Sequence, residues 1–330
     1  MIRMKSNLRW LFFLPVAGLL TGCSSDSDAE QSFVKDDIRF AVSTDWQSTG
    51  GTRAAVYDQV TSLQTDGQFK AYAYVHGSKS MYINGSTVSY NGNPASWNFD
   101  DGKHYWPMVE TLDFLAFMPV TQPDYITDSK FAEDNSPLFS CDLTSYMTSA
   151  SQPASMKEFI FAFTPNQSKA EQGASGVAIN FMHPLAVVNV KLSKAHPNVT
   201  IKNITFKGLK TGGDFGTVYD AGVSKYVPQW TSVSGSADFV ASYNSEYADA
   251  TATYPLQIGG PYLVVPQNFE GGKQTIEVSF SEYGVEDTLE AEVAMPQWLS
   301  GHSYTYTFTI DGRLKVTAEI DSSINPWTKW

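Results

Sequence analysis

Few residues in this chain have the type and spacing of a catalytic site. The histidines lie neither in an HExxH pattern nor at metal-ligand spacing from a cysteine. The patterns GxSxG, GxGxxG and the P-loop do not occur. The sequence therefore predicts a protein that is not an enzyme and has no cofactor and no metal site. Carboxylate pairs far apart in the sequence leave a hydrolase as an alternative.

Two polar places allow more than one interpretation. Asp100 and Asp101 precede a glycine among aromatic residues, which suits a sugar site as well as a hairpin loop with packed aromatic side chains. The aromatic neighbours are Trp97, Phe99, Tyr105 and Trp106. His183 precedes Pro184 at the edge of an apolar strand pattern. We interpret His183 as a structural hydrogen-bonding residue rather than a catalytic one.

Cys23 is the residue with the clearest chemistry, because a thiolate is the best nucleophile among the side chains. Basic residues precede an apolar run from Trp10 to Leu20. A helix of about eleven residues spans only about 16 Å, too little for a hydrocarbon core of about 30 Å. The segment therefore indicates a secretory signal, with a retained anchor as the alternative. Residues 20–23, Leu-Thr-Gly-Cys, resemble the lipobox of bacterial lipoproteins, which implies cleavage before Cys23 and acylation of its sulfur.

The segment after Cys23 and the composition limit the location and the partners. Residues 24–30 are polar and acidic and resemble the tether that sends some lipoproteins of Bacteroidota to the cell surface, although a simple solvated linker is the alternative. We expect a surface-exposed outer-membrane lipoprotein. The net charge of −12 argues against nucleic acid as a partner. With Cys23 acylated, Cys141 has no cysteine to pair with, so burial of a core must stabilise the chain.

Alternating apolar residues predict an all-β fold. Aromatic residues make up 14% of the chain and charged residues only 17%, which favours strands. Period-2 patterns recur along the chain, and the clearest, in residues 304–310, is followed across Asp311-Gly312 by another, as in a hairpin. Helical signal is limited to residues 54–64. Two antiparallel β-sandwich domains are therefore expected, meeting near residue 173 after the polar stretch 164–176. The predicted divisions are 1–22 (signal peptide), 23–53 (lipidated tether and removable strand), 54–172 (N-terminal sandwich) and 173–330 (C-terminal sandwich).

A set of short patterns occurs in an order and spacing that resemble the fimbrillin family of type V pili, also called the Mfa-like family. Each pattern alone is a packing pattern, and their joint order carries the resemblance over nearly the whole chain. The patterns are Thr52-Arg53-Ala54; Tyr105-Trp106-Pro107; Leu112 to Phe117 with Pro119; Ile179 to Leu185 followed by Val187 to Leu192; Tyr262 to Gln267; Trp298, Gly301, Tyr304 and Tyr306; and Asn325 to Trp330.

The resemblance implies a fold and a maturation route. It implies two transthyretin-like sandwich domains, export as a lipoprotein precursor, and an arginine-specific protease that removes an N-terminal strand outside the cell. The emptied groove then accepts a strand of another subunit. Arg53, followed by Ala54, matches the cleavage site, and the glycines before it suit a flexible loop. Arg39 is the alternative but lies inside a strand pattern, and Arg53 could also be an ordinary exposed arginine.

The strand patterns support the same interpretation. Residues 33–42 form an apolar strand before a glycine-rich loop, and strand addition at a sheet edge is a known mode of recognition. Its apolar positions are Val34, Ile38, Phe40 and Val42. Residues 313–330 are either the donated strand or the last strand of the core. The apolar positions of this candidate donor are Leu314, Val316, Ala318 and Ile320.

The expected function is a structural or adhesive fimbrial subunit of stalk, tip or anchor type. The expected partners are other pilus subunits, the outer membrane through the lipid on Cys23, an arginine-specific protease, and surface ligands of a host or of other bacteria. A surface lipoprotein that binds glycans and does not polymerise is the alternative.

Overall fold

The computed structural model describes residues 36–44, 60–147, 156–172, 175–195, 199–246, 256–310 and 316–323. All of them belong to one compact unit, Asp36–Trp330. The predictions on Cys23, Val34, Arg53, Ala54 and Leu314 lie outside the described residues. No helix in the described ranges is long and apolar enough to cross a membrane.

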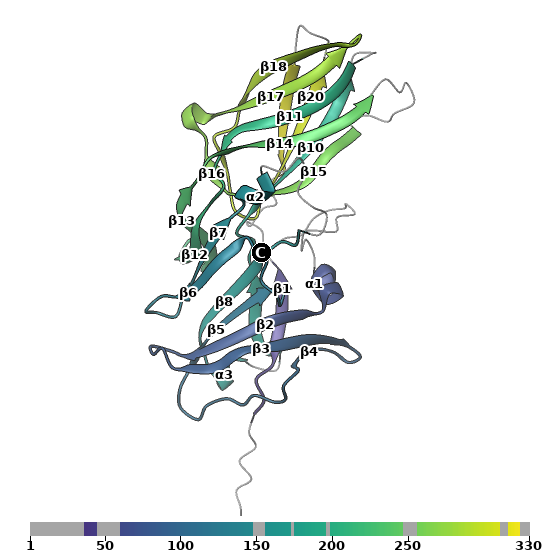
Figure 1. The fold of residues 1–330 in the computed structure, drawn as a ribbon. Coiled ribbons are helices and arrows are strands. Elements are labelled where there is room, and N and C mark those ends of the chain that lie inside the picture. Colours follow the sequence, from purple (N-terminus) through teal and green to yellow (C-terminus); the bar gives the residue numbers. More distant parts are fainter. Residues whose placement is uncertain are drawn as a thin grey trace, which may run out of the picture. The chain divides into compact units, whose positions relative to one another are not determined.

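The N-terminal part of this unit is built on a seven-stranded sheet with the order β8-β5-β2-β3-β4-β1-β9 (Figure 1). Its strands are β1 (Phe40–Thr44), β2 (Gln68–Val75), β3 (Met81–Gly92), β4 (Ala95–Phe99), β5 (Leu112–Met118), β8 (Ile160–Gln167) and β9 (Val177–Phe181). Phe161 and Met182 form an antiparallel bridge, so the β8 and β9 edges of the sheet come together there. This closure places β1 inside the sheet, between β4 and β9.

Strand β5 shows that both faces of the sheet are covered by packed side chains. All seven of its residues are buried, as expected for an almost continuous apolar run. Phe114 belongs to the core cluster that contains β1, and Phe117 belongs to the cluster on the other face. The one charged residue, Asp113, accepts hydrogen bonds from the Asn135 side chain at 2.9 Å and the Asn166 backbone at 2.8 Å. Its buried carboxylate is therefore well satisfied.

Three four-stranded sheets and one two-stranded sheet complete the described fold. One combines β6 (Ile126–Phe131) and β7 (Pro137–Asp142) with β12 (Gly212–Asp220) and β13 (Lys225–Ser234). The next has the order β15 (Leu256–Val264), β10 (Ala186–Ala195), β20 (Ser303–Ile310), β21 (Val316–Ser323). The third has the order β14 (Ala237–Glu246), β11 (Val199–Leu209), β17 (Lys273–Glu282), β18 (Val285–Ala294), and the small one pairs β16 (Gln267–Asn268) with β19 (Gln297–Trp298).

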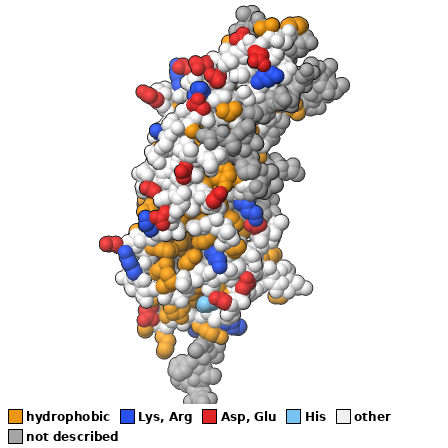
Figure 2. Space-filling view, in the orientation of Figure 1, with side chains coloured by type: hydrophobic (Ala, Val, Ile, Leu, Met, Phe, Trp, Pro, Cys, Tyr) orange, Lys and Arg blue, Asp and Glu red, His pale blue; other side chains and the backbone are white. Residues whose placement is uncertain are grey.

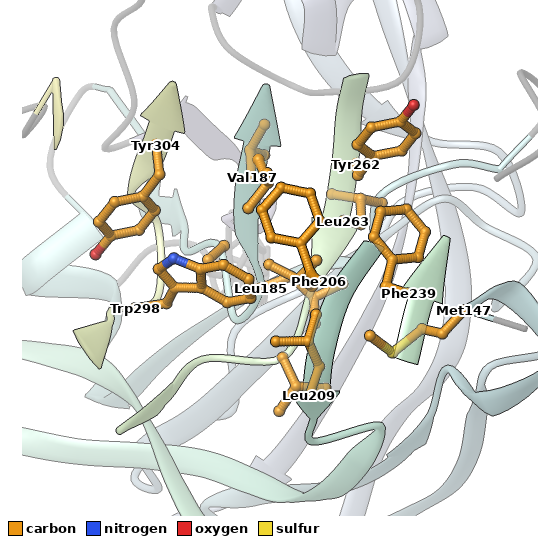
Figure 3. Close-up of a cluster of buried hydrophobic side chains, with 14 of the residues drawn as sticks. Met147, Leu185, Val187, Phe206, Leu209, Phe239, Tyr262, Leu263, Trp298 and Tyr304 are labelled. Atoms are coloured by element: carbon orange, nitrogen blue, oxygen red, sulfur yellow. The ribbon is translucent and has the colours of Figure 1, made fainter. Parts of the chain in front are cut away.

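The β10 and β11 sheets enclose an aromatic core (Figure 3). Phe206 on β11 points toward Tyr306 on β20 at a centroid distance of 5.1 Å, nearly perpendicular to it. A hydrogen-bonded chain of polar groups crosses this core: Trp298 Nε1 donates to the Tyr306 hydroxyl at 3.0 Å, and that hydroxyl donates to Gln274 Oε1 at 2.5 Å. Burial raises the pKa of the Tyr306 hydroxyl well above its ordinary value. The alternating apolar residues of the sequence thus become the inner faces of two packed sheets.

Most sequence-based predictions of secondary structure are confirmed. The fold is nearly all β; β20 and β21 pair antiparallel, and α1 (Val60–Asp66) lies where a helical turn was expected. The other helices are α2 (Thr144–Met147), α3 (Lys169–Gln172) and the 3-10 turn η1 (Glu270–Gly272). In the described part of the chain two pairs are parallel, β1 with β9 and β10 with β20, where antiparallel sheets were expected. The division at residue 173 stays a prediction; β9, which follows it, pairs with β1.

Candidate functional site

Strand β1 occupies a position that is deep in the sheet although it comes first in the described chain. Five consecutive residues, from Phe40 to Thr44, pair in parallel with β9, and Phe40 also pairs with Trp97 of β4. Ile38 and Phe40 are 4% and 6% exposed, and Val42 packs against the same core. The apolar side chains predicted for a removable strand therefore do face the interior of the sheet.

Aromatic rings form the apolar wall around β1. The Phe40 ring meets Phe99 at a centroid distance of 5.2 Å, Phe69 at 5.6 Å and Phe114 at 5.8 Å, each edge to face. These three rings come from β4, β2 and β5, so β1 contacts residues throughout the N-terminal part of the sheet. Such edge-to-face pairs add stabilisation beyond that of apolar burial alone.

We call the position that β1 occupies the β1 groove. Strands β4 and β9 form its two sides, and the rings of Phe69, Phe99 and Phe114 form its apolar wall. The contacts at its two ends are described next.

Polar contacts hold the first end of β1. Ile38 N donates to His104 O at 2.8 Å, and Trp106 N donates to Asp36 O at 3.2 Å. Asp37 forms a salt bridge with Lys103. The aromatic residues near the acidic pair are accordingly packed: Trp97 and Trp106 are 7% and 9% exposed.

Asp101 accepts hydrogen bonds from Ser86 at 2.7 Å and is 3.0 Å from His104 Nε2. The Ser86 hydroxyl, followed by the His104 ring, lowers the pKa of the Asp101 carboxyl. This place is therefore a turn that follows β4 and has packed aromatic side chains beside it. Because β4 pairs with β3 and β1 and not with β5, it is not the hairpin loop that the sequence suggested.

Two residues that sequence reasoning missed bind the backbone of β1. The Gln172 side chain accepts from Arg39 N at 2.8 Å and donates to Asp37 O at 3.2 Å. Gly176, at φ +100°, leaves no room for a side chain, because a Cβ there would lie 2.6 Å from the carbonyl carbon of Arg39. Both residues lie in the polar stretch 164–176 that was interpreted as a boundary. A glycine followed by an apolar alternation was the signal available in the sequence.

The far end of β1 meets a buried polar pair. Thr44 Oγ1 lies 3.0 Å from His183 Nε2, and His183 Nδ1 lies 2.8 Å from Glu158 Oε1. Thr44 is 6% exposed, and both His183 and Glu158 are fully buried. His183 thus has the structural, hydrogen-bonding position that the sequence indicated, and its partner is the candidate removable strand. Neither Thr44 nor Glu158 was identified from the sequence.

The structure places the other predicted residues as follows. Val316, Ala318 and Ile320 lie on β21, which among the described strands pairs with β20 alone and so forms one edge of its sheet. Arg39 lies within the β1 segment; its side chain is exposed, but its backbone N donates to Gln172 and its O accepts from Val177 N at 2.7 Å. A protease needs an extended, released backbone, so Arg39 is a poor site for cutting while β1 is seated.

A separate cavity of about 650 Å³ lies along β13. Its lining includes Asp220, Trp230, Asn268 and His302. Trp230 Nε1 donates to Pro184 O at 2.8 Å, which fixes the indole ring. The volume is in the range of small-ligand pockets, and an aromatic ring with polar neighbours suits a sugar.

Figure 2 shows how side chains are distributed over one face of the molecule, with acidic groups gathered near the end that carries β17 and β18. Strand β18 is an edge strand whose carboxylates include Glu286, Asp287, Glu290 and Glu292. Charged side chains on an edge strand discourage the addition of another strand there. This edge is therefore a less suitable acceptor than the apolar β1 groove.

Fold and site together define a class of β-sheet protein. In this class the first described strand, here β1, completes a sheet that is otherwise formed by strands from later in the chain. The sequence profile of the fimbrillin-like family matches residues 52–327, so the chain belongs to the fimbrillin-like family. It is accordingly a pilus or adhesin subunit of the cell surface. A comparison with curated proteins finds no match.

A comparison with solved structures finds similar chains from Bacteroides ovatus and Porphyromonas gingivalis. A candidate cell adhesion protein from Bacteroides ovatus is 12% identical, with 87% of this chain and 98% of that chain covered and a TM-score of 0.49. The tip fimbrial protein Mfa3 from Porphyromonas gingivalis, with a C-terminal truncation, is 10% identical over 87% and 100% of the two chains, with a TM-score of 0.37. The fimbrial anchor protein Mfa2 from the same organism is 11% identical over 86% and 98%, with a TM-score of 0.29.

Proposed function

We propose that this chain is a structural subunit of a cell-surface fimbria that assembles by strand exchange in the β1 groove. The observation that carries the proposal is the position of β1: an interior strand of the sheet whose two pairing partners, β4 and β9, are far away in sequence. Loss of β1 would leave β9 and the β1-facing edge of β4 unpaired and would expose the ring of Phe69 among others. Such an open edge strongly favours capture of another strand.

The proposed maturation begins with export and anchoring. Cys23 receives the acyl chains and holds the precursor on the outer membrane, because several chains anchor stably where a single one does not. An arginine-specific protease then cuts between Arg53 and Ala54. Residues 23–53, which include β1, leave the groove, and the cut subunit is released from its lipid. An anchor subunit would be the variant that keeps the lipid and is not cut.

The proposed donor is the C-terminal strand of a second subunit. In its own sheet β21 is an edge strand with β20 as its one hydrogen-bonded neighbour, so it can leave without disrupting an interior pair. Its positions Val316, Ala318 and Ile320 alternate as the apolar residues of β1 do. The role is structural: the protein needs no catalytic group and no cofactor for it.

The decisive experiment replaces the cleavage residue in cells. Arg53→Ala should abolish the ladder that surface-extracted fimbriae give on an unheated gel, and the chain should keep its N-terminal segment and its lipid. Arg39→Ala is the matched control, since this arginine lies on the seated strand and its side chain is exposed. A normal ladder from Arg53→Ala, with chains that start upstream of residue 54, would show the maturation proposal to be wrong.

A second candidate function is glycan binding, which the cavity along β13 favours. Its fixed Trp230 ring and polar neighbours suit a neutral sugar, and the net charge of −12 disfavours acidic glycans. Binding of neutral oligosaccharides that is lost in Trp230→Ala but retained in Arg53→Ala would support this function. Absence of binding to an array of neutral glycans would contradict it.

A further inference from the structure

The apolar part of the β1 groove does not determine the register of a strand that replaces β1. Ile38, Phe40 and Val42 face the same core and recur at every second residue. A strand moved by one residue would turn its polar face inward, but a strand moved by two residues would still place apolar side chains in the groove. Another feature must therefore distinguish one register from the next.

His183 provides that feature at the far end of the groove. Its ring is fully buried, with Glu158 at 2.8 Å from Nδ1 and the Thr44 hydroxyl at 3.0 Å from Nε2. A hydroxyl both donates and accepts, so it can satisfy Nε2 whichever proton arrangement the His183–Glu158 pair has. An apolar side chain at the same position would remove the hydrogen bond that β1 makes to the His183 ring.

We propose that the buried His183–Glu158 pair selects a hydroxyl on the strand that replaces β1 and thereby sets the register of that strand. This inference rests on the proposed strand exchange and names its occupant, the C-terminal strand of a second copy of this chain. Buried polar groups have this role elsewhere, where one polar residue in an apolar seam determines register.

The C-terminal strand has the pattern that this selection requires. Three apolar positions and then a hydroxyl follow one another at intervals of two residues in both segments. These positions are Ile38, Phe40, Val42 and Thr44 in β1, and Val316, Ala318, Ile320 and Ser322 in the C-terminal strand.

Other registers of the same strand fail at His183 or in the apolar part of the groove. A shift by two residues brings Ile320 to His183 in one direction and Ile324 in the other. Registers that bring Thr317 or Ser323 to His183 place charged side chains where β1 has apolar ones. Among the hydroxyls of β21, Ser322 is therefore the one that fits while apolar residues fill the groove.

The match also determines the direction of the incoming strand. Phe40, Val42 and Thr44 pair in parallel with Val177, Ile179 and Phe181 of β9. A donor in the same order runs parallel to β9. Ile320 then pairs with Ile179, and Ser322 pairs with Phe181.

The test uses the full chain cut at Arg53 by an arginine-specific protease, with fluorescent peptides of residues 313–330. Ser322→Ala should weaken binding by about 10–100-fold, because it removes a buried hydrogen bond to the His183 ring. Ser322→Thr should bind like the native peptide, since it keeps the hydroxyl. Ser323→Ala is the matched control, a neighbouring serine on the opposite face, and should also bind like the native peptide. Equal binding of all four peptides would overturn the register inference and leave strand exchange standing, whereas binding of none would overturn strand exchange and this inference with it.

A second measurement tests the same inference by changing His183 in the accepting chain instead of the peptide. In a His183→Leu chain the difference between the native and Ser322→Ala peptides should vanish. Should that variant fail to fold, cross-linking decides. An Ile320→Cys peptide should form a disulfide with an Ile179→Cys chain, and an Ala318→Cys peptide should not. A disulfide from Ala318→Cys instead would show a register shifted by two residues and would overturn the proposal.

Discussion

Gly176 lies directly against the backbone of Arg39: a Cβ at Gly176 would be 2.6 Å from the carbonyl carbon of Arg39 and 2.7 Å from its oxygen. The two residues belong to segments that are far apart in the chain. Val177 N, which follows Gly176, donates to Arg39 O at 2.7 Å. The absence of a side chain at position 176 therefore allows the first strand to pair with β9.

Gly176→Ala should destabilise the uncut chain more than the backbone angle alone explains. Gly102 is the matched control, with φ +106° against +100° for Gly176, but with open space around the added Cβ. Gly102→Ala should cost about 1–2 kcal/mol in the free energy of unfolding. Gly176→Ala should cost roughly 3–5 kcal/mol, because backbone atoms must also move. Urea unfolding measures both, and equal losses would contradict the close contact.

Phe40→Ala should lower the stability of the uncut chain by about 3–5 kcal/mol, the usual cost of removing a buried ring. Arg39→Ala, the neighbouring exposed side chain, should stay within about 0.5 kcal/mol. Denaturant unfolding measures the difference. After cleavage at Arg53 and displacement of β1, the two variants should be equally stable, and a persistent difference would mean that β1 does not leave.

Thr44→Val should cost about 1–3 kcal/mol in the free energy of unfolding, because the shape is kept while the hydroxyl bonded to His183 is lost. Thr44→Ser keeps the hydroxyl and should lose less. Thermal unfolding of the uncut chain compares the three proteins. A Thr44→Val variant as stable as the native chain would show that the contact with His183 does not stabilise β1 in its groove.

Cys141 should be unreactive in the folded chain. Burial raises the pKa of its thiol well above the ordinary value, and the side chain is 4% exposed, so the thiolate is scarce and shielded. In a Cys23→Ser chain at pH 8, a thiol reagent should label nothing under native conditions and one thiol per chain in urea. Rapid labelling of the native protein would indicate that β7 opens readily.

Much of the fold was predictable because it depends on local patterns. The alternation in residues 304–310 and the buried parity of Ile38, Phe40 and Val42 were correct, since period 2 is a property of any strand with one buried face. The order of short patterns along the chain indicated the family, which the profile match over residues 52–327 shows. The hairpin of β20 and β21 was correct for the same local reason.

The sequence by itself determined the strand pattern, the family and the face that β1 buries. Only the tertiary structure decided what that face meets. Thr44 and His183 are 139 positions apart, and Arg39 and Gln172 are 133 apart. Nothing local to either partner specifies such a contact, because pairing between distant strands follows from closure of the whole sheet rather than from residue type. For this reason a stretch that looks like a polar linker holds the glycine and the glutamine that secure the first strand.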